Sequence, residues 1–155
     1  MIYLTYEEMQ HYYDNLNIVE MNLSEINGLK GLCYGENIAI EESLTQTEKA
    51  CVLAEELGHH YTSVGCILDQ TDFANRKQER QARLWGYNKL IGLMGIVRAF
   101  NAGCQNQYEI AEYLDVTEEY LQECINCYQS KYGICTTVDN YVIYFVPYLT
   151  VTEMI

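Results

Sequence analysis

The run AEELGHH at residues 54–60 decides how this chain folds. Thr45 and Glu48 form a capping-box pair ahead of it, which predicts a helix over residues 46–62. Gly58 lies inside that helix, where a glycine costs about 1 kcal/mol relative to alanine. We therefore expect another backbone or a ligand to approach the helix closely at this position.

The helix places acidic and imidazole groups on one face. Glu55 and His59 are four residues apart, so their side chains lie one above the other and can hold one ion. This is the logic of the H-E-x-x-H motif, with a glutamate in place of the first histidine. Glu56 occupies the position of the glutamate that acts as general base on a metal-activated water.

A catalytic metal needs a third protein ligand, and the next predicted helix, over residues 74–91, offers one. Glu79 is the natural candidate, and the small Ala82 one turn later would let the two helices approach. The predicted ligands are thus Glu55, His59 and Glu79, around Zn²⁺. Two carboxylates leave the ion with less positive charge, so a harder metal such as Mn²⁺ is the alternative.

The same run allows two alternatives. Glu55 and Glu56 could instead form a solvated acidic face, each paired with the histidine four residues on. A register of Glu56 with His60 would put Leu57 where the base should stand, and leucine cannot take a proton. We reject that register and expect His60 to lie outside the ligand set.

The amino-acid composition limits the classes of protein to which this chain can belong. The 155 residues, 49% apolar and 20% charged, suit one globular domain with a small appended lobe. No apolar stretch approaches a membrane span, and the first residues do not resemble a secretory signal, so we expect a cytoplasmic protein. The seven cysteines should be reduced thiols, with a zinc site at Cys124 and Cys127 as the minor alternative.

The net charge of −13 argues against direct nucleic-acid binding, which needs clustered Lys and Arg. It suits a partner with a basic surface. Residues 105–131 alone carry six acidic side chains and one lysine, so a DNA-binding role for that segment is disfavoured as well.

The rest of the chain predicts an α+β fold. A first helix is expected over 5–16, and three strand-like segments should form a small antiparallel sheet: 18–23, 29–34 and 38–40. Three further helices follow, near 96–100, 108–114 and 117–132, the last two joined by a turn short enough to resemble a helix-turn-helix. We expect one compact unit with three parts: a core over 1–91, a helical lobe over 92–133 and a strand-like tail over 134–155.

Several segments together resemble the ImmA/IrrE metallo-endopeptidases of prophages and integrative elements. The similarity runs from about residue 30 to 133 in the same order and spacing, and it is carried by Cys51–Ser63, Gln78–Trp85, Leu90–Ile91, Tyr108–Glu119 and Tyr128–Gly133. The resemblance implies a zincin-like core and site-specific cleavage of a helix-turn-helix repressor, which would derepress the genes of the mobile element.

Carried onto this chain, the resemblance makes Glu56 the base and His59 and Glu79 metal ligands. Glu55 stands where the family usually has its first histidine, which leaves the identity of the metal open. The alternative function is that of a catalytically weak or inactive relative that binds the repressor as an antirepressor. Nothing in the sequence indicates an oligomeric state.

Overall fold

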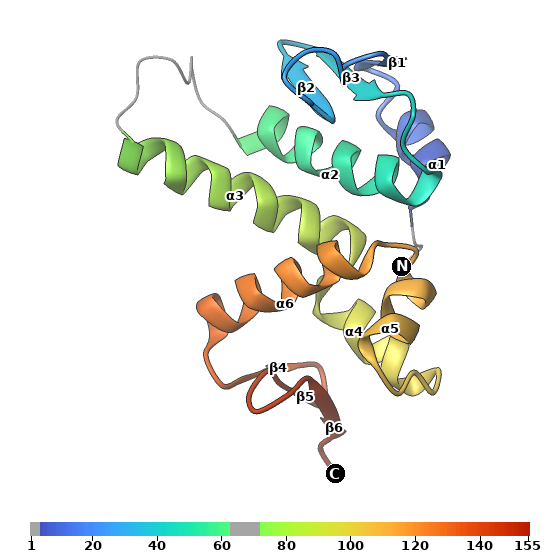
Figure 1. The fold of residues 1–155 in the computed structure, drawn as a ribbon. Helices are drawn as coiled ribbons and strands as arrows, with labels where there is room; N and C mark the ends of the chain where they lie inside the picture. The colour runs from blue at the N-terminus through green and yellow to red at the C-terminus, as the bar shows by residue number, and fades with distance from the viewer. Residues whose placement is uncertain (1–3, 63–71) are drawn as a thin grey trace. The chain divides into compact units, whose positions relative to one another are not determined.

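The computed structural model describes residues 4–62 and 72–155 (Figure 1). The chain divides into two compact units, residues 1–89 and 90–155. This division lies two residues from the predicted boundary between core and lobe. That the core, lobe and tail act as one compact unit stays a prediction.

The first unit combines a small sheet with helices. In chain order its elements are α1 (Tyr6–Tyr12), β1 (Asn17–Met21), β2 (Gly31–Tyr34), β3 (Asn37–Glu41), α2 (Gln46–Thr62) and α3 (Asp72–Leu90), whose last residue falls in the second unit. The predicted capping box of Thr45 and Glu48 forms, and Thr5 and Glu8 form a second one. In each, the threonine hydroxyl accepts from the backbone N–H of the glutamate, whose side chain accepts from the backbone N–H of the threonine. Figure 1 shows α2 between the sheet and α3.

The prediction of a wholly antiparallel sheet is wrong. The strand order is β1-β3-β2, with β2 and β3 antiparallel but β1 and β3 parallel. A turn through Gly35, whose φ is +60°, folds β2 back onto β3. Residues 22–30 carry the chain past the sheet before β2 begins, so β3 fills the place beside β1 that a simple meander would give to β2.

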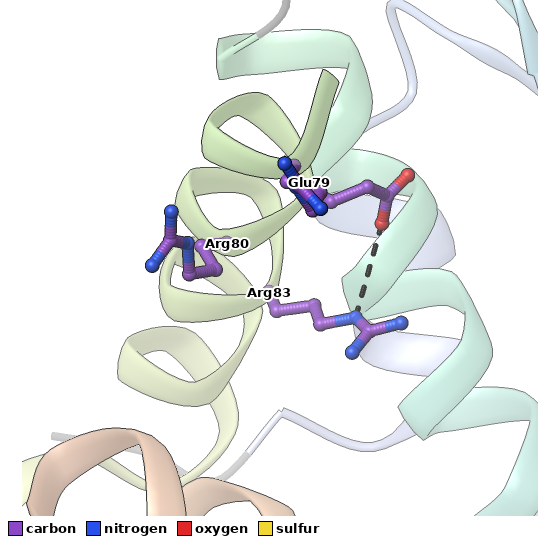
Figure 2. A pocket seen from close by; sticks show the side chains of 4 residues that line it. Glu79, Arg80 and Arg83 are labelled. Carbon is purple, nitrogen blue, oxygen red and sulfur yellow. Dashed lines mark ion pairs between the residues drawn. The ribbon is translucent and has the colours of Figure 1, made fainter. Parts of the chain in front are cut away.

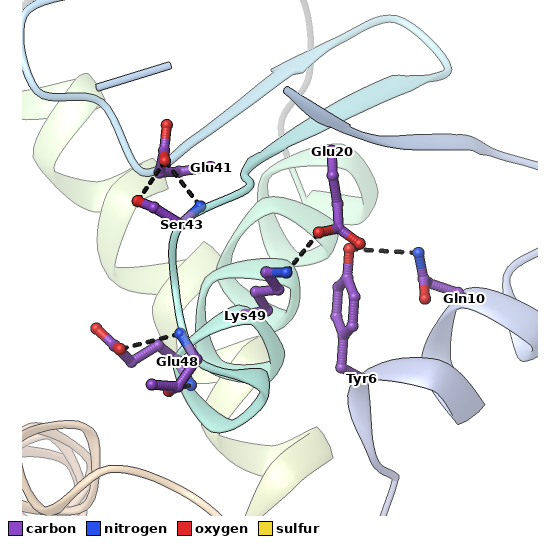
Figure 3. A network of polar contacts seen from close by, with 8 residues as sticks. Tyr6, Gln10, Glu20, Glu41, Ser43, Glu48 and Lys49 are labelled. Atoms are coloured by element: carbon purple, nitrogen blue, oxygen red, sulfur yellow. Dashed lines mark hydrogen bonds and ion pairs between the residues drawn. The ribbon is translucent and has the colours of Figure 1, made fainter. Parts of the chain in front are cut away.

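A buried carboxylate stabilises this arrangement of β1 and β3. One oxygen of Glu41, at the end of β3, accepts from the backbone N–H groups of Leu23 and Ser24, at 2.7 and 2.9 Å. The other accepts from the backbone N–H and the hydroxyl of Ser43 (Figure 3). These bonds to the charged form lower the pKa of Glu41 to about 2, the Ser43 hydroxyl contributing most. These hydrogen bonds connect the loop after β1 to the end of β3.

A second polar network joins α1, β1 and α2. Lys49 of α2 is only 6% exposed and forms an ion pair with Glu20 of β1 (Figure 3). Beside it, burial and the Glu20 carboxylate raise the pKa of Tyr6 to about 12, and the Tyr6 hydroxyl accepts from the Gln10 amide at 3.3 Å. A buried lysine is tolerated because its charge has a partner.

The second unit begins with helices and ends in a sheet. Its elements are α4 (Gly92–Asn101), α5 (Gln107–Leu114), α6 (Glu118–Tyr132), β4 (Cys135–Val138), β5 (Tyr141–Tyr144) and β6 (Thr150–Glu153). Asp115 takes the left-handed conformation after α5, and the Thr117 hydroxyl caps α6. Whether α5 and α6 have helix-turn-helix geometry stays a prediction.

The tail contains more structure than its sequence indicated. Strands β4, β5 and β6 form an antiparallel meander, where the sequence predicted only a strand-like tail. The third strand lies beyond the only proline in the chain and alternates weakly, so its period-2 signal is short. Ile143 and Phe145 point into the core of this unit, where the ring of Phe145 lies near that of Tyr128.

The six cysteines in the described ranges are all free thiols, and Cys66 lies outside those ranges. Burial raises the pKa of Cys124, which favours an inert thiol over a metal ligand.

In the described part of the chain, no helix has both the length and the apolar character needed to cross a membrane.

The Glu41 anchor makes a pH-dependent contribution to stability. Because its pKa in the folded state lies below its unfolded value, that contribution is complete above the unfolded pKa and is lost as the pH falls toward 2. Glu41→Gln should therefore lower the urea midpoint at pH 7, and the gap to the unaltered chain should narrow steadily between pH 5 and 3. The exposed neighbour substitution Glu42→Gln is the control; a gap that stays constant with pH would contradict the assignment.

Candidate metal centre

Three side chains from two helices converge in the first unit. Glu55 and His59 lie one turn apart on α2, and Glu79 comes from α3. One potential ligand atom of each lies within 4.8 Å of the others, and all three side chains are half-buried. Among the residues that the structure describes, this is the one such group of acidic, histidine or cysteine side chains.

The convergence depends on a close contact between the two helices. A Cβ atom added to Gly58 would lie 2.1 Å from the backbone oxygen of Ala82, a distance that no side chain can occupy. Ala82 is itself fully buried. The approach of a second backbone is thus the reason for a glycine inside α2, as the sequence predicted, and the small side chain at 82 permits it.

The donor set fits a divalent ion. His59 Nε2 lies 3.4 Å from Glu79 Oε1, and two ligands each about 2.1 Å from a tetrahedral ion are about 3.4 Å apart. One imidazole and two carboxylates are ligands that Zn²⁺ and Mn²⁺ both accept. Convergence across two helices is not required of a solvated acidic face on α2 alone, so the arrangement favours the metal site over that alternative.

Glu56 lies beside the cluster but faces the sheet. A Cβ atom on Gly31 of β2 would come within 3.0 Å of a Glu56 carboxylate oxygen, so the side chain packs against bare backbone there. Burial, followed by the charges of Glu55 and Glu79, raises the pKa of Glu56 to about 7. A half-buried carboxyl group with this pKa can both accept and release a proton near neutral pH.

Gly31 was not identified as a site residue from the sequence. A glycine within a strand pattern often marks a close approach, and that was the available signal. The same strand carries Cys33, whose pKa is raised by burial and by the Glu56 charge. Strand β2 therefore forms the wall against which the proposed base rests.

Arg83 of α3 was also missed. Its Nε atom lies 3.8 Å from Glu55 Oε1 and 3.8 Å from Glu79 Oε2 (Figure 2). The spacing of Glu79 and Arg83, four residues apart on one helix, was the signal that could have found it. The contact to Glu55 crosses between helices and needs the tertiary structure.

His60 lies apart from the three converging side chains. Its Nδ1 atom lies 2.9 Å from the carbonyl oxygen of Gly35, to which a protonated Nδ1 donates. The His60 ring packs edge-on against Tyr61, and Tyr61 stacks on Trp85 of α3 at 5.4 Å between ring centres. His60 therefore helps to hold α2 against the turn after β2.

One protein family matches most of the chain. The sequence model of the peptidase family M78, described as the IrrE N-terminal-like domain, matches residues 13–126. The chain belongs to this family, as the resemblance had indicated. A search of curated proteins and a search of solved structures each gave no match.

The contact at Gly58 can be tested by adding one methyl group. Gly58→Ala gains helix propensity but must push Ala82 away, so we expect it to destabilise the first unit by about 2 to 3 kcal/mol. Gly95→Ala is the matched control, because a Cβ atom there would meet nothing nearer than 3.4 Å. Urea unfolding of both variants should show a large loss for the first and a change within about 1 kcal/mol for the second. Equal effects would contradict the role given to Gly58.

Proposed function

We propose that this protein is a zinc-dependent endopeptidase with a zincin-like core that cleaves a helix-turn-helix repressor of a prophage or mobile element. Membership of a peptidase family supports the general class of reaction. The observation that carries the proposal is the convergence of Glu55, His59 and Glu79 next to the half-buried Glu56.

In this proposal the converging side chains hold the ion and Glu56 handles the proton. Bound Zn²⁺ would supply a Lewis acid that polarises the scissile carbonyl group and acidifies water. Glu56 would take a proton from the attacking water and pass it to the departing amine. Its raised pKa suits both transfers, because the group loses and regains a proton close to neutral pH.

The ligand set bears on the choice of metal. Glu55 and Glu79 together neutralise the charge of a divalent ion, which a set with two histidines does not do. Water should therefore be acidified less than in a site with two histidines and one carboxylate. Mn²⁺, which prefers carboxylate oxygen, is the second candidate metal.

The proposed substrate follows from the family resemblance and from charge. A repressor that binds DNA has a basic surface, and the net charge of −13 on this chain would attract it. The acidic α5–α6 segment suits contact with such a protein better than contact with DNA. The cytoplasmic location remains a prediction from the sequence.

One observation favours a second candidate function. Glu55 stands where a histidine is usual, and a weakened metal site would leave a protein that binds the repressor without cutting it. Metal analysis of the purified chain separates the two functions. Stoichiometric metal supports the peptidase, whereas repressor binding without metal supports the antirepressor.

The cleavage test uses a helix-turn-helix repressor as the substrate. Incubation with Zn²⁺ or Mn²⁺ should yield two defined fragments, and Glu56→Gln should slow their formation about 100-fold or more, because proton transfer is lost. Glu25→Gln, a substitution of an exposed residue, is the control and should cleave the repressor at the unaltered rate. Cleavage at the unaltered rate by Glu56→Gln, with its metal content unchanged, would contradict the proposed role of Glu56.

A further inference from the structure

Basic residues are concentrated on one helix of this acidic chain. Of its nine Lys and Arg residues, five lie within α3: Arg76, Lys77, Arg80, Arg83 and Lys89. Most of the remaining surface would repel an acidic segment of another protein. The α3 face is the place where such a segment would be attracted.

Three of these side chains share an open pocket with a candidate metal ligand. Arg76, Arg80 and Arg83 recur at helical spacing, and together with Glu79 they line a pocket of about 580 Å³ (Figure 2). The pocket therefore shares Glu79 with the candidate metal centre. A side chain bound there would belong to a residue close to the scissile bond.

The three arginines differ in their contacts. Arg83 pairs with Glu55 and Glu79, while neither Arg76 nor Arg80 forms an ion pair with any residue in the described ranges. Guanidinium groups recognise carboxylates through two parallel N–H bonds. Arg76 and Arg80 therefore offer donors to an incoming anion.

We propose that Arg76 and Arg80 form a subsite for an Asp or Glu side chain of the substrate near the bond to be cut. This inference rests on the proposed peptidase function and adds a specificity to it. The basic surface of a repressor would be drawn to the acidic body of this protein, while one acidic side chain would be held at α3. Opposite charges at the two contacts would fix the direction in which the chain crosses the site.

Binding can be measured separately from cleavage. The Glu56→Gln protein is titrated with a short fluorescein-labelled Ala/Ser peptide that carries a central Glu-Glu pair, and with its Gln-Gln counterpart. Anisotropy should show about tenfold tighter binding of the acidic peptide. Arg80→Gln and Arg76→Gln should each remove most of that preference, and added salt should weaken it.

Lys77→Gln is the matched control, because Lys77 is exposed on the same helix but does not line the pocket. Equal affinity for the two peptides, or equal effects of Lys77→Gln and Arg80→Gln, would overturn the subsite. A preference for the acidic peptide in a protein that cleaves no repressor would retain the subsite while the peptidase proposal fails.

The contacts of Arg83 carry a second, independent inference. Glu79 uses one carboxylate oxygen toward His59, at 3.4 Å, and the other toward Arg83, at 3.8 Å. The Arg83 guanidinium group thus lies near the Glu79 oxygen that does not face His59. We infer that Arg83 is a positioning residue that orients Glu55 and Glu79 so that each offers the ion one oxygen.

Metal affinity distinguishes orientation from simple charge. Removing a nearby positive charge should strengthen cation binding if Coulomb forces alone matter. If Arg83 orients the ligands, Arg83→Gln should instead weaken Zn²⁺ binding about 10-fold or more in calorimetric titration. Arg80→Gln removes the same charge from the same helix without touching the ligands, so it should bind Zn²⁺ as tightly as the unaltered chain or slightly more tightly.

Circular dichroism of each variant checks that the helices remain folded. Arg83→Lys keeps the charge but not the planar fork, so it should recover only part of the affinity. Unchanged or tighter Zn²⁺ binding by Arg83→Gln would overturn the positioning role. If the unaltered chain binds no metal, both this inference and the metal centre fail, whereas the peptide-binding result stands by itself.

Discussion

The backbones of α2 and α3 meet where Gly58 faces the carbonyl oxygen of Ala82, and the candidate metal centre depends on that meeting. A single methyl group at position 58 would lie 2.1 Å from the oxygen. At this separation, side chains of ordinary length on the two helices can reach one point. Glu55 and His59 supply one side of the cluster, and Glu79 supplies the other. A wider spacing would leave two acidic helix faces with no common ion.

Bringing three carboxyl groups together in a chain of net charge −13 requires compensation. Glu55, Glu56 and Glu79 repel one another when ionised. The pKa of Glu56 is raised mainly by burial and further by this repulsion. Arg83 lies against two of the three carboxylates and reduces the repulsion between them. The same features that make the cluster costly without a cation make it suited to holding one.

The sheet supports this site from the other side of α2. Strand β2 brings Gly31 against the Glu56 side chain, which reduces the exposure of the carboxyl group to water. The strand is held by its pairing with β3, and the end of β3 is anchored by Glu41 to the loop after β1. The Lys49–Glu20 pair fastens α2 to β1 in turn. Local polar contacts thus determine how firmly the proposed base is placed.

The sequence by itself determined the local features of this protein. Helix α2, its Thr45 cap and the shared face of Glu55 and His59 follow from spacing within a few residues, and the family could be identified from motifs in order. Only the tertiary structure decided the parallel pairing of β1 with β3, the packing of Gly31 on Glu56, the third strand of the tail and the contact of Arg83 with Glu55. These features join residues far apart in the chain. Periodicity and capping report on neighbours along one element, so they carry no information about which distant backbone or side chain will lie opposite.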